Sequence, residues 1–210
     1  MPVVLLVRHG QASYGAEDYD QLSDVGRTQS EVVGKELRRR TLRDPVVVHG
    51  SLRRQRDTAS IALPDADATT DKRWDEYDHL DLLKRYASPP EGEPPTSSRE
   101  VQTLLDDALH AWVGDGDGGG WPAFRDGATA ALDELVADLD KGRDAVVFTS
   151  GGIVAAVCSS LLAGGAASVV ALNRVTVNGG ITKLVAGTSG TSLVSFNDHA
   201  HLDPDAVTYR

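Results

Sequence analysis

An unbroken apolar run near the start of the chain is the feature that most constrains its fold. Val3 to Val7 are all valine or leucine, and the run stops at Arg8. A short run of this kind is typical of a strand that is buried on both faces, as in a parallel sheet with helices on either side. We therefore expect this segment to be a central strand of a layered fold.

Strand-like and helix-like segments alternate along the rest of the chain. Ser23 and Ser51 are favourable N-cap residues, and each stands at the start of a predicted helix. Helices are predicted over 23–40, 51–63, 100–113, 124–139 and 153–162, and strands over 3–7, 45–48, 145–148, 169–172, 181–185 and 192–196. This alternation predicts an α/β fold whose sheet is mostly parallel.

Length and composition predict one domain. The chain has 210 residues and a hydrophobic content of 40%, which is enough for one sizeable core, so we expect a single domain over 1–210. Two irregular stretches are predicted to be loops: 88–98 is rich in proline and serine, and 114–120 is almost entirely glycine and aspartate. The segment 100–113 between them is amphipathic, and we expect it to be a packing helix.

Charge and motif content argue against several classes of protein. A net charge of −10 argues against a nucleic-acid partner, because such proteins usually need a basic surface. No run approaches the roughly 20 apolar residues of a membrane span, so we expect a cytoplasmic protein with no membrane partner. The single cysteine, Cys158, lies in an apolar stretch and is expected to be a buried hydrophobe. Neither metal-ligand spacing nor a nucleotide-binding glycine loop occurs, so no cofactor and no metal are predicted.

Two predicted strands are followed by loops whose residues could bind a ligand or take part in a reaction. Arg8-His9-Gly10 follows the first strand, and Thr149-Ser150-Gly151-Gly152 follows the strand at 145–148. Because ligands of parallel sheets collect at the carboxyl ends of strands, we expect both loops to face one site. An Arg-His-Gly tripeptide is weak evidence by itself, since a hydrogen-bonded structural histidine at a strand end is at least as common.

Five motifs in order give more specific information. The chain contains LLVRHGQAS, LSDVGRTQS, SLRRQRDTA, WDEYDH and FTSGG. Each has many chance matches alone, but their order and spacing resemble the histidine phosphatase superfamily of phosphoglycerate-mutase-like proteins over roughly residues 3–202. The resemblance implies a three-layer α/β/α sandwich, with residues of about 77–125 forming a helical and loop cover over the substrate mouth.

The resemblance implies roles for four residues. His9 would be the nucleophile that takes up the phosphoryl group, which requires a neutral imidazole whose other nitrogen donates to a backbone carbonyl. Arg8 and Arg54 would bind phosphoryl oxygens, and Glu76 would protonate the leaving oxygen and later deprotonate water. The residues alone allow simpler interpretations: Arg54 could belong to a solvent-exposed basic face of its helix, and Glu76 could be one more exposed acid. The sign of the Glu76 pKa shift stays open, because burial raises the pKa and a cationic pocket lowers it.

Ser150 departs from the family's pattern. Most members have a second histidine there, and a serine offers only a neutral hydrogen bond, a loss of about a few kcal/mol in transition-state stabilisation. The backbone N–H groups of Gly151 and Gly152 at the start of the next helix still suit an anion. Ser150 and Gly151 are therefore candidate phosphate-binding residues, together with Gln11 and Ser13, which follow the signature histidine.

His79 stands three residues after Glu76 and is a hypothetical replacement for the missing imidazole. Its location is the only motive, and a surface or packing histidine is the simpler interpretation.

Three classes of function stay open. The first is a phosphatase that transfers phosphate from a small or peptide-borne monoester to His9 and then to water. The second is a mutase-type phosphotransferase, which shares the phosphohistidine step and differs in its acceptor. The third is a catalytically weak module that binds phosphoesters and regulates a partner, for which Ser150 is the argument. A homodimer through an edge strand or an exposed helix is compatible with the sequence.

Overall fold

The structure is a computed structural model that describes residues 1–13, 20–87, 98–116, 120–139 and 142–209. In chain order, its elements are β1 (Val3–Arg8), α1 (Asp24–Arg39), β2 (Val46–His49), α2 (Arg53–Ala62), β3 (Ala68–Thr70), η1 (Lys72–Trp74), α3 (His79–Tyr86), α4 (Ser98–Gly114), α5 (Trp121–Asp138), β4 (Ala145–Thr149), α6 (Gly151–Leu161), α7 (Ala166–Val175), β5 (Ile181–Gly187), β6 (Gly190–Asp198) and η3 (Pro204–Ala206).

Within the described residues, the strands form one sheet in the order β3-β2-β4-β1-β5-β6. The pairs β1–β4, β2–β4 and β2–β3 are parallel. The pairs β1–β5 and β5–β6 are antiparallel. β1 is central, because Leu5 pairs with Val146 on one side and with Lys183 on the other. The predicted central strand and mostly parallel sheet are confirmed.

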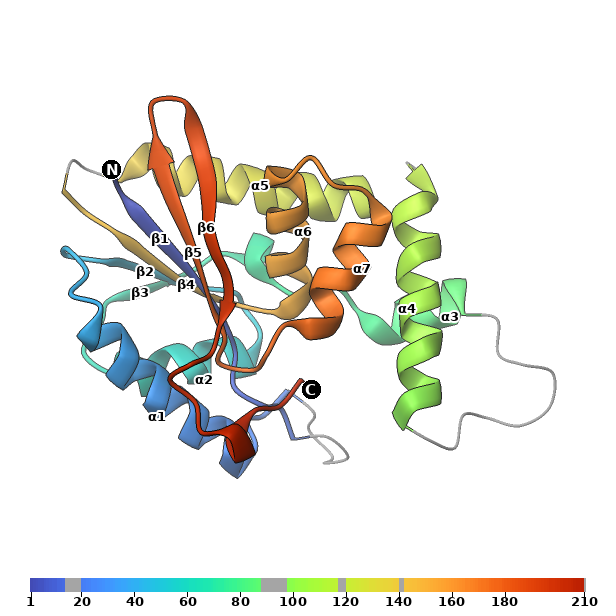
Figure 1. Cartoon of the computed structure of the whole chain (residues 1–210), viewed down its shortest axis with the longest axis horizontal. Helices are drawn as coiled ribbons and strands as arrows, with labels where there is room; N and C mark the ends of the chain where they lie inside the picture. Colours follow the sequence, from blue (N-terminus) through green and yellow to red (C-terminus); the bar gives the residue numbers. More distant parts are fainter. Residues whose placement is uncertain (14–19, 88–97, 117–119, 140–141, 210) are drawn as a thin grey trace.

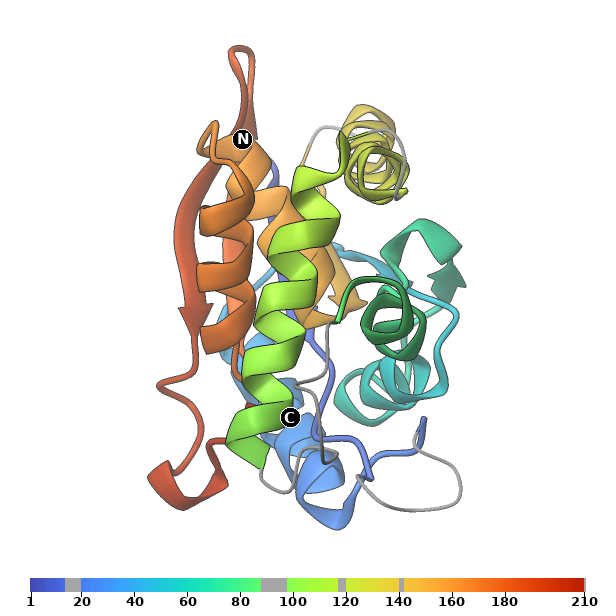
Figure 2. The ribbon, with the colours of Figure 1, turned by 90° about the vertical axis from the view of Figure 1, so that its right-hand side faces the viewer.

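Helices cover both faces of the sheet, as Figures 1 and 2 show. Successive side chains of β1 point to opposite faces. Leu5 packs in one buried cluster with Val33 of α1, and Leu6 packs in another with Leu132 of α5 and Ile153 of α6. The predicted three-layer α/β/α architecture is therefore confirmed, and it explains why the opening run is apolar at every position.

The predicted strand over 169–172 is wrong, because these residues belong to α7. Val169 and Val170 are buried together with Trp112 of α4 and Ala156 of α6. A run of four apolar residues fits one turn of a buried helix as well as a strand, and packing between helices decides the outcome here. The three-residue strand β3 was missed, since its sequence Ala-Thr-Thr is too short to show a period.

The predicted N-cap at Ser51 is also wrong. Helix α2 begins at Arg53, and its N-cap is Leu52, which makes no side-chain capping bond. The hydroxyl of Ser51 donates instead to a carboxylate oxygen of Asp75 at 2.6 Å. Ser23 does cap α1, since its Oγ accepts from the N–H of Gly26 at 3.0 Å.

The elements expected in the cover region are partly described. The predicted loop 88–98 lies outside the described residues except for Ser98, with which α4 begins. In the predicted loop 114–120, Gly114 ends α4 and Gly120 is the N-cap of α5, while 117–119 lie outside the described residues. Helix α5 begins at Trp121 rather than at Phe124. No helix in the described ranges is long and apolar enough to cross a membrane.

Two glycines let helix α1 approach the loop after β1. A Cβ atom on Gly10 would lie 2.3 Å from the carbonyl oxygen of Gly26, and a Cβ on Gly26 would lie 2.1 Å from the carbonyl oxygen of Gln11. Both distances are far below van der Waals contact, so only glycine fits at either position. This approach fixes the N-terminus of α1 against the loop that carries His9.

Candidate active site

The carboxyl edge of the sheet brings the two predicted loops together. Arg8 at the end of β1 pairs with Thr149 at the end of β4, and the N–H of His9 donates to the carbonyl of Thr149 at 2.9 Å. His9 and Ser150 are therefore both at the carboxyl ends of adjacent parallel strands. The structure thus brings both loops to one edge of the sheet, and whether both face one site depends on the pocket described below.

His9 is held as a neutral imidazole with one specific nitrogen available as an acceptor. The ring is 5% exposed, and Nδ1 lies 2.7 Å from the carbonyl oxygen of Gly10. The Nε of Arg54 donates to Nε2 at 3.1 Å. Because an arginine Nε always carries hydrogen, Nε2 must be the unprotonated nitrogen and Nδ1 must donate to Gly10. Burial, followed by the charges of Arg54 and Arg8, lowers the pKa of His9 well below its usual value.

Arg54 is oriented by an acid outside its own helix. Its Nη1 donates to Asp20 at 2.6 Å, and its side chain is 10% exposed. The neighbouring arginines differ, since Arg53 and Arg56 both lie 3.5 Å from Asp57 and are much more exposed. Of the arginines in this motif, Arg54 is the one that the structure brings to His9.

Arg8 reaches the same pocket from the end of β1. Its Nη1 donates to the carbonyl oxygens of Thr176 and Tyr209, the latter at 3.0 Å. Both acceptors are backbone carbonyl oxygens, and they fix the direction of a guanidinium that stays charged at any working pH. The position of Arg8 therefore depends on residues at the far end of the chain.

Glu76 lies in the pocket wall with both carboxylate oxygens engaged by backbone donors. Oε2 accepts from the N–H of Gly152 at 3.0 Å, and Oε1 accepts from the N–H of Tyr77 at 3.2 Å. Burial raises the pKa of Glu76, and this effect exceeds the lowering by Gly152, Arg54 and Arg8. The open sign of the shift is thus resolved: the carboxyl is biased toward its protonated form.

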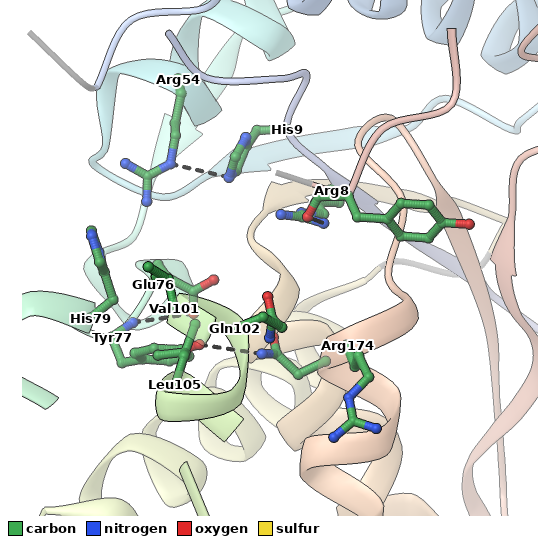
Figure 3. A pocket seen from close by; sticks show the side chains of 12 residues that line it. Arg8, His9, Arg54, Glu76, Tyr77, His79, Val101, Gln102, Leu105 and Arg174 are labelled. Atoms are coloured by element: carbon green, nitrogen blue, oxygen red, sulfur yellow. Dashed lines mark hydrogen bonds between the residues drawn. The ribbon is translucent and has the colours of Figure 1, made fainter. Parts of the chain in front are cut away.

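One pocket collects these groups. Figure 3 shows Arg54 and His9 on one side, with Glu76, Tyr77, Val101 and Leu105 on the facing side. The residues that line it are Arg8, His9, Arg54, Glu76, Tyr77, His79, Val101, Gln102, Leu105, Asn173, Arg174 and Tyr209. The four residues for which the family resemblance implied catalytic roles therefore lie around one pocket, although they come from distant parts of the chain.

The other candidate residues lie at different places. Ser150 is fully buried, its Oγ accepts from Nε2 of Gln55 at 2.8 Å, and it is not part of the pocket's described lining. Gly151 begins α6 beside Arg8, since a Cβ placed there would lie 3.5 Å from the Nε of Arg8. The N–H of Gly152, which was expected to suit an anion, donates to Glu76 instead.

Gln11 and Ser13 line a second, separate depression with Ser23 and Arg27. The N–H of Gln11 donates to Oε1 of Gln29 at 2.8 Å, and its side-chain oxygen accepts from the hydroxyl of Ser23. Within the described lining, the structure does not bring these two residues to the pocket of His9.

His79 does line the pocket, at the start of α3. Asp78 caps this helix, because its Oδ1 accepts from the N–H of Leu80 at 2.9 Å. Partial burial lowers the pKa of His79, so the neutral imidazole is favoured. The sequence hypothesis placed it correctly near the site, whereas its role is a separate question.

The lining or supporting residues that the sequence did not point to include Asp20, Tyr77, Asn173 and Tyr209. Tyr77 and Asn173 contact each other, with Nδ2 of Asn173 donating to the phenolic oxygen at 3.3 Å. Tyr77 stands next to Glu76 in a quoted motif, which was a usable signal. The others carried none, because only the folded chain brings them near His9.

No cluster of three or more histidine, cysteine, aspartate or glutamate side chains in the described part of the chain is arranged to hold a metal ion. Cys158 is buried, and burial raises the pKa of its thiol to about 12, so the predicted role as a small buried hydrophobe fits.

The fold places the chain among α/β/α proteins whose ligands bind where parallel strands end. A sequence model of the histidine phosphatase superfamily (branch 1) matches residues 4–199, and the chain therefore belongs to this superfamily. No curated protein sequence matches the chain.

Solved structures of related fold include several phosphatases. A functionally characterised open reading frame from Mycobacterium tuberculosis has 22% identity and a TM-score of 0.68, covering 93% of this chain and 97% of that one. A phosphoserine phosphatase from Entamoeba histolytica has 18% identity and a TM-score of 0.67, covering 96% and 100%. A mycobacterial glucosyl-3-phosphoglycerate phosphatase has 22% identity and a TM-score of 0.65, covering 95% and 100%. At these identities, the likeness shows a shared fold.

Proposed function

We propose that the protein is a metal-independent phosphomonoesterase that works through a phosphohistidine on His9. The observation that carries this proposal is the Nε2 acceptor of a neutral, buried imidazole, with two arginines beside it and a protonatable carboxyl across the pocket. Membership of the superfamily supports it. The substrate is a small or peptide-borne phosphate ester.

The reaction has two steps. In the first, Nε2 of His9 attacks phosphorus, the bond from phosphorus to the ester oxygen breaks, and that oxygen takes the proton of Glu76. In the second, water attacks the phosphohistidine and gives a proton to the Glu76 carboxylate, which releases phosphate and restores both side chains. The Nε–H of Arg54 transfers its hydrogen bond from Nε2 to a phosphoryl oxygen when substrate binds, while Asp20 keeps the guanidinium in place.

The missing second histidine has a candidate substitute. The hydroxyl of Ser150 is engaged with Gln55, so we propose that its family role passes to groups already in the pocket: Arg8, with the adjacent Gly151, and His79 as an accessory donor. Gln11 and Ser13 would then act on the phosphate only through the loop they share with His9. If His79→Ala keeps wild-type kcat and KM, His79 has no part in the reaction.

We further propose that residues 77–125 serve as the cover of the site. Helix α4 supplies Val101, Gln102 and Leu105 to the pocket, and α3 supplies His79. This region would select the substrate, while the strand-end loops would perform the chemistry.

The test is hydrolysis of phenyl phosphate with a chelator present, together with an alkaline quench to trap phosphoenzyme, since the P–N bond of phosphohistidine survives in alkali and breaks in acid. The wild type should form an acid-labile phosphoenzyme, and His9→Ala should form none and lose turnover. His49→Ala is the matched control, because His49 is also buried and its Nδ1 also lies 2.7 Å from the next carbonyl, but it is not among the residues described as lining the pocket.

The acceptor separates the first two classes of function. Phosphate released in ¹⁸O-labelled water carries one labelled oxygen if water is the acceptor. Transfer to phosphoglycerate without label would indicate the mutase alternative. Binding of phosphate without any phosphoenzyme would favour the regulatory module and overturn the proposal.

A further inference from the structure

The side of the pocket where the leaving group must lie can be assigned from the chemistry. In phosphoryl transfer, the attacking and leaving atoms lie roughly in line through phosphorus. The attacking Nε2 of His9 and the proton donor Glu76 lie on facing sides of the pocket (Figure 3). The alcohol part of the substrate therefore lies on the Glu76 side, beside Tyr77, Val101 and Leu105.

An apolar stripe of α4 supplies much of this wall. Val101, Leu105, Ala108 and Trp112 recur at helical spacing, so they share one face of the helix. Ala108 and Trp112 are buried in the cluster below the pocket, and the Trp112 ring lies 5.5 Å from the Tyr77 ring. The stripe continues beyond that cluster, and its first two members are only partly buried and line the pocket.

The polar groups of the same wall are bonded to protein partners. The phenol of Tyr77 accepts from Asn173 at 3.3 Å. Nε2 of Gln102 donates to Oδ1 of Asp106 at 2.8 Å, and Arg174 donates through Nε and Nη2 to Oδ2 of Asp106 at 2.9 and 2.6 Å. Asp106, which is largely buried, already balances the charge of Arg174, so a second substrate anion would gain less from this guanidinium than from one without an acidic partner.

We propose that Tyr77, Val101 and Leu105 form a subsite for a carbon-rich, uncharged leaving group. The preferred substrate is then the phosphate monoester of an aromatic or longer aliphatic alcohol, rather than one that carries a second anion. The proposal deepens the proposed function and rests on it, because the side of the leaving group is defined by attack from His9.

A series of n-alkyl phosphates from ethyl to hexyl tests the subsite. The leaving alcohols differ little in acidity, so the series varies mainly the apolar surface. The kcat/KM should rise by roughly two- to fourfold for each methylene that enters the subsite. Glycerol phosphate and 3-phosphoglycerate should be poorer substrates than butyl phosphate. A flat alkyl series, or a preference for 3-phosphoglycerate, would overturn the proposal.

Two variants locate the effect. Leu105→Asn should flatten the alkyl series, and Val101→Asn should act in the same direction. Leu162→Asn is the matched control, because Leu162 is 59% exposed at the C-terminal end of α6, remote from the pocket lining, and the series should keep its slope. Retention of the full slope in both wall variants would also contradict the assignment.

Binding of n-alkylphosphonates, which cannot be hydrolysed, separates this proposal from the proposed function. Calorimetry should show the dissociation constant falling with chain length in the wild type. If no ester is hydrolysed but this trend is present, the subsite stands and the phosphatase proposal fails. If esters are hydrolysed but neither turnover nor binding depends on chain length, the phosphatase proposal stands and the subsite fails.

Discussion

His9 and His49 have the same local surroundings in the backbone. His9 directly follows β1 and His49 is the last residue of β2, and each precedes a glycine and has its Nδ1 2.7 Å from the carbonyl oxygen of that glycine. What distinguishes His9 is the donor at its other nitrogen, the Nε of Arg54, which comes from another element. In His9 the glycine carbonyl therefore holds the hydrogen on Nδ1, and Arg54 donates to the unprotonated Nε2.

The pKa shifts predict an acidic optimum for catalysis. Burial raises the pKa of Glu76, which must be protonated to donate, and lowers the pKa of His9, which must be neutral to attack. The kcat/KM should therefore fall as pH rises through the pKa of Glu76, with the acid limb displaced well below the usual histidine range. A pH profile with phenyl phosphate measures this.

The control for that profile is 2,4-dinitrophenyl phosphate, whose leaving group needs little protonation. The dinitrophenyl ester loses its own second proton at a lower pH than the phenyl ester, so each profile is first corrected for the ionisation of the free ester. A shallower alkaline decline for the dinitrophenyl ester then isolates the contribution of Glu76. In Glu76→Gln the phenyl ester should lose most of its turnover. Turnover of phenyl phosphate that increases from pH 5 to pH 8 would be incompatible with Glu76 as the acid.

The same shift makes stability depend on pH. A carboxyl with a raised pKa in the folded state binds its proton more tightly there than in the unfolded chain, so its contribution to stability is present at low pH and is lost as pH rises through the folded pKa. Glu76→Gln keeps an oxygen acceptor for Gly152 and removes this titration. Denaturant unfolding should show the variant gaining stability relative to wild type between pH 4 and pH 8. An unchanging difference would argue that Glu76 is ionised throughout.

The two strands that end at the candidate site were predictable from the sequence. Because both of their faces are buried, each strand is an unbroken apolar run. The apolar runs at 3–7 and 145–148 correspond to β1 and β4, and the loops after them lie together. The run at 169–172 gave the same signal but belongs to α7, which is buried against α4 and α6. A short apolar run indicates that a segment is buried. Whether the segment forms a helix or a strand depends on the elements that pack against it in the folded protein.

The contact between helix α1 and the catalytic loop depends on glycine. In Gly26→Ala, the new Cβ would meet the carbonyl oxygen of Gln11 at 2.1 Å, so the loop carrying His9 or the start of α1 must shift. We expect a loss of about 1 to 3 kcal/mol in the free energy of unfolding, with reduced turnover. Denaturant unfolding and phenyl phosphate assays measure both.

Gly127→Ala is the matched control, because Gly127 lies within α5 and a Cβ there meets nothing within 4 Å. This variant should be more stable than wild type by up to about 1 kcal/mol, since alanine favours the helix, and its activity should be unchanged. Equal effects of the two substitutions would exclude close packing as the cause.

For the molecule as a whole, the site depends on a segment that the sequence analysis did not reach. The family resemblance extends only to about residue 202, yet the carbonyl of Tyr209 accepts from Arg8. Residues 203–209 contain no repeating apolar pattern, so no sequence signal connected them to the pocket. The candidate catalytic residues were proposed from motifs, whereas the groups that orient them come from chain segments that only tertiary structure brings near.

Two buried amides join this C-terminal segment to the catalytic loop. Asn178 donates through Nδ2 to the carbonyl of His9 at 3.2 Å and accepts from the hydroxyl of Thr208 at 3.0 Å. Gln29 accepts from the N–H of Gln11 at 2.8 Å and donates to the same hydroxyl at 3.0 Å. Thr208 is thus the common partner of both amides that hold the backbone around His9.

Thr208→Val keeps the shape of the side chain and removes this hydroxyl. Because Asn178 and Gln29 each lose a buried hydrogen-bond partner, we expect the free energy of unfolding to fall by about 1 to 3 kcal/mol. Loosening of the backbone at His9 and of Arg8 should also raise KM for phenyl phosphate more than it lowers kcat. Thr208→Ser retains the hydroxyl and should restore both values, whereas a serine variant as impaired as the valine variant would show that the methyl group, and not the hydrogen bonds, connects this segment to the site.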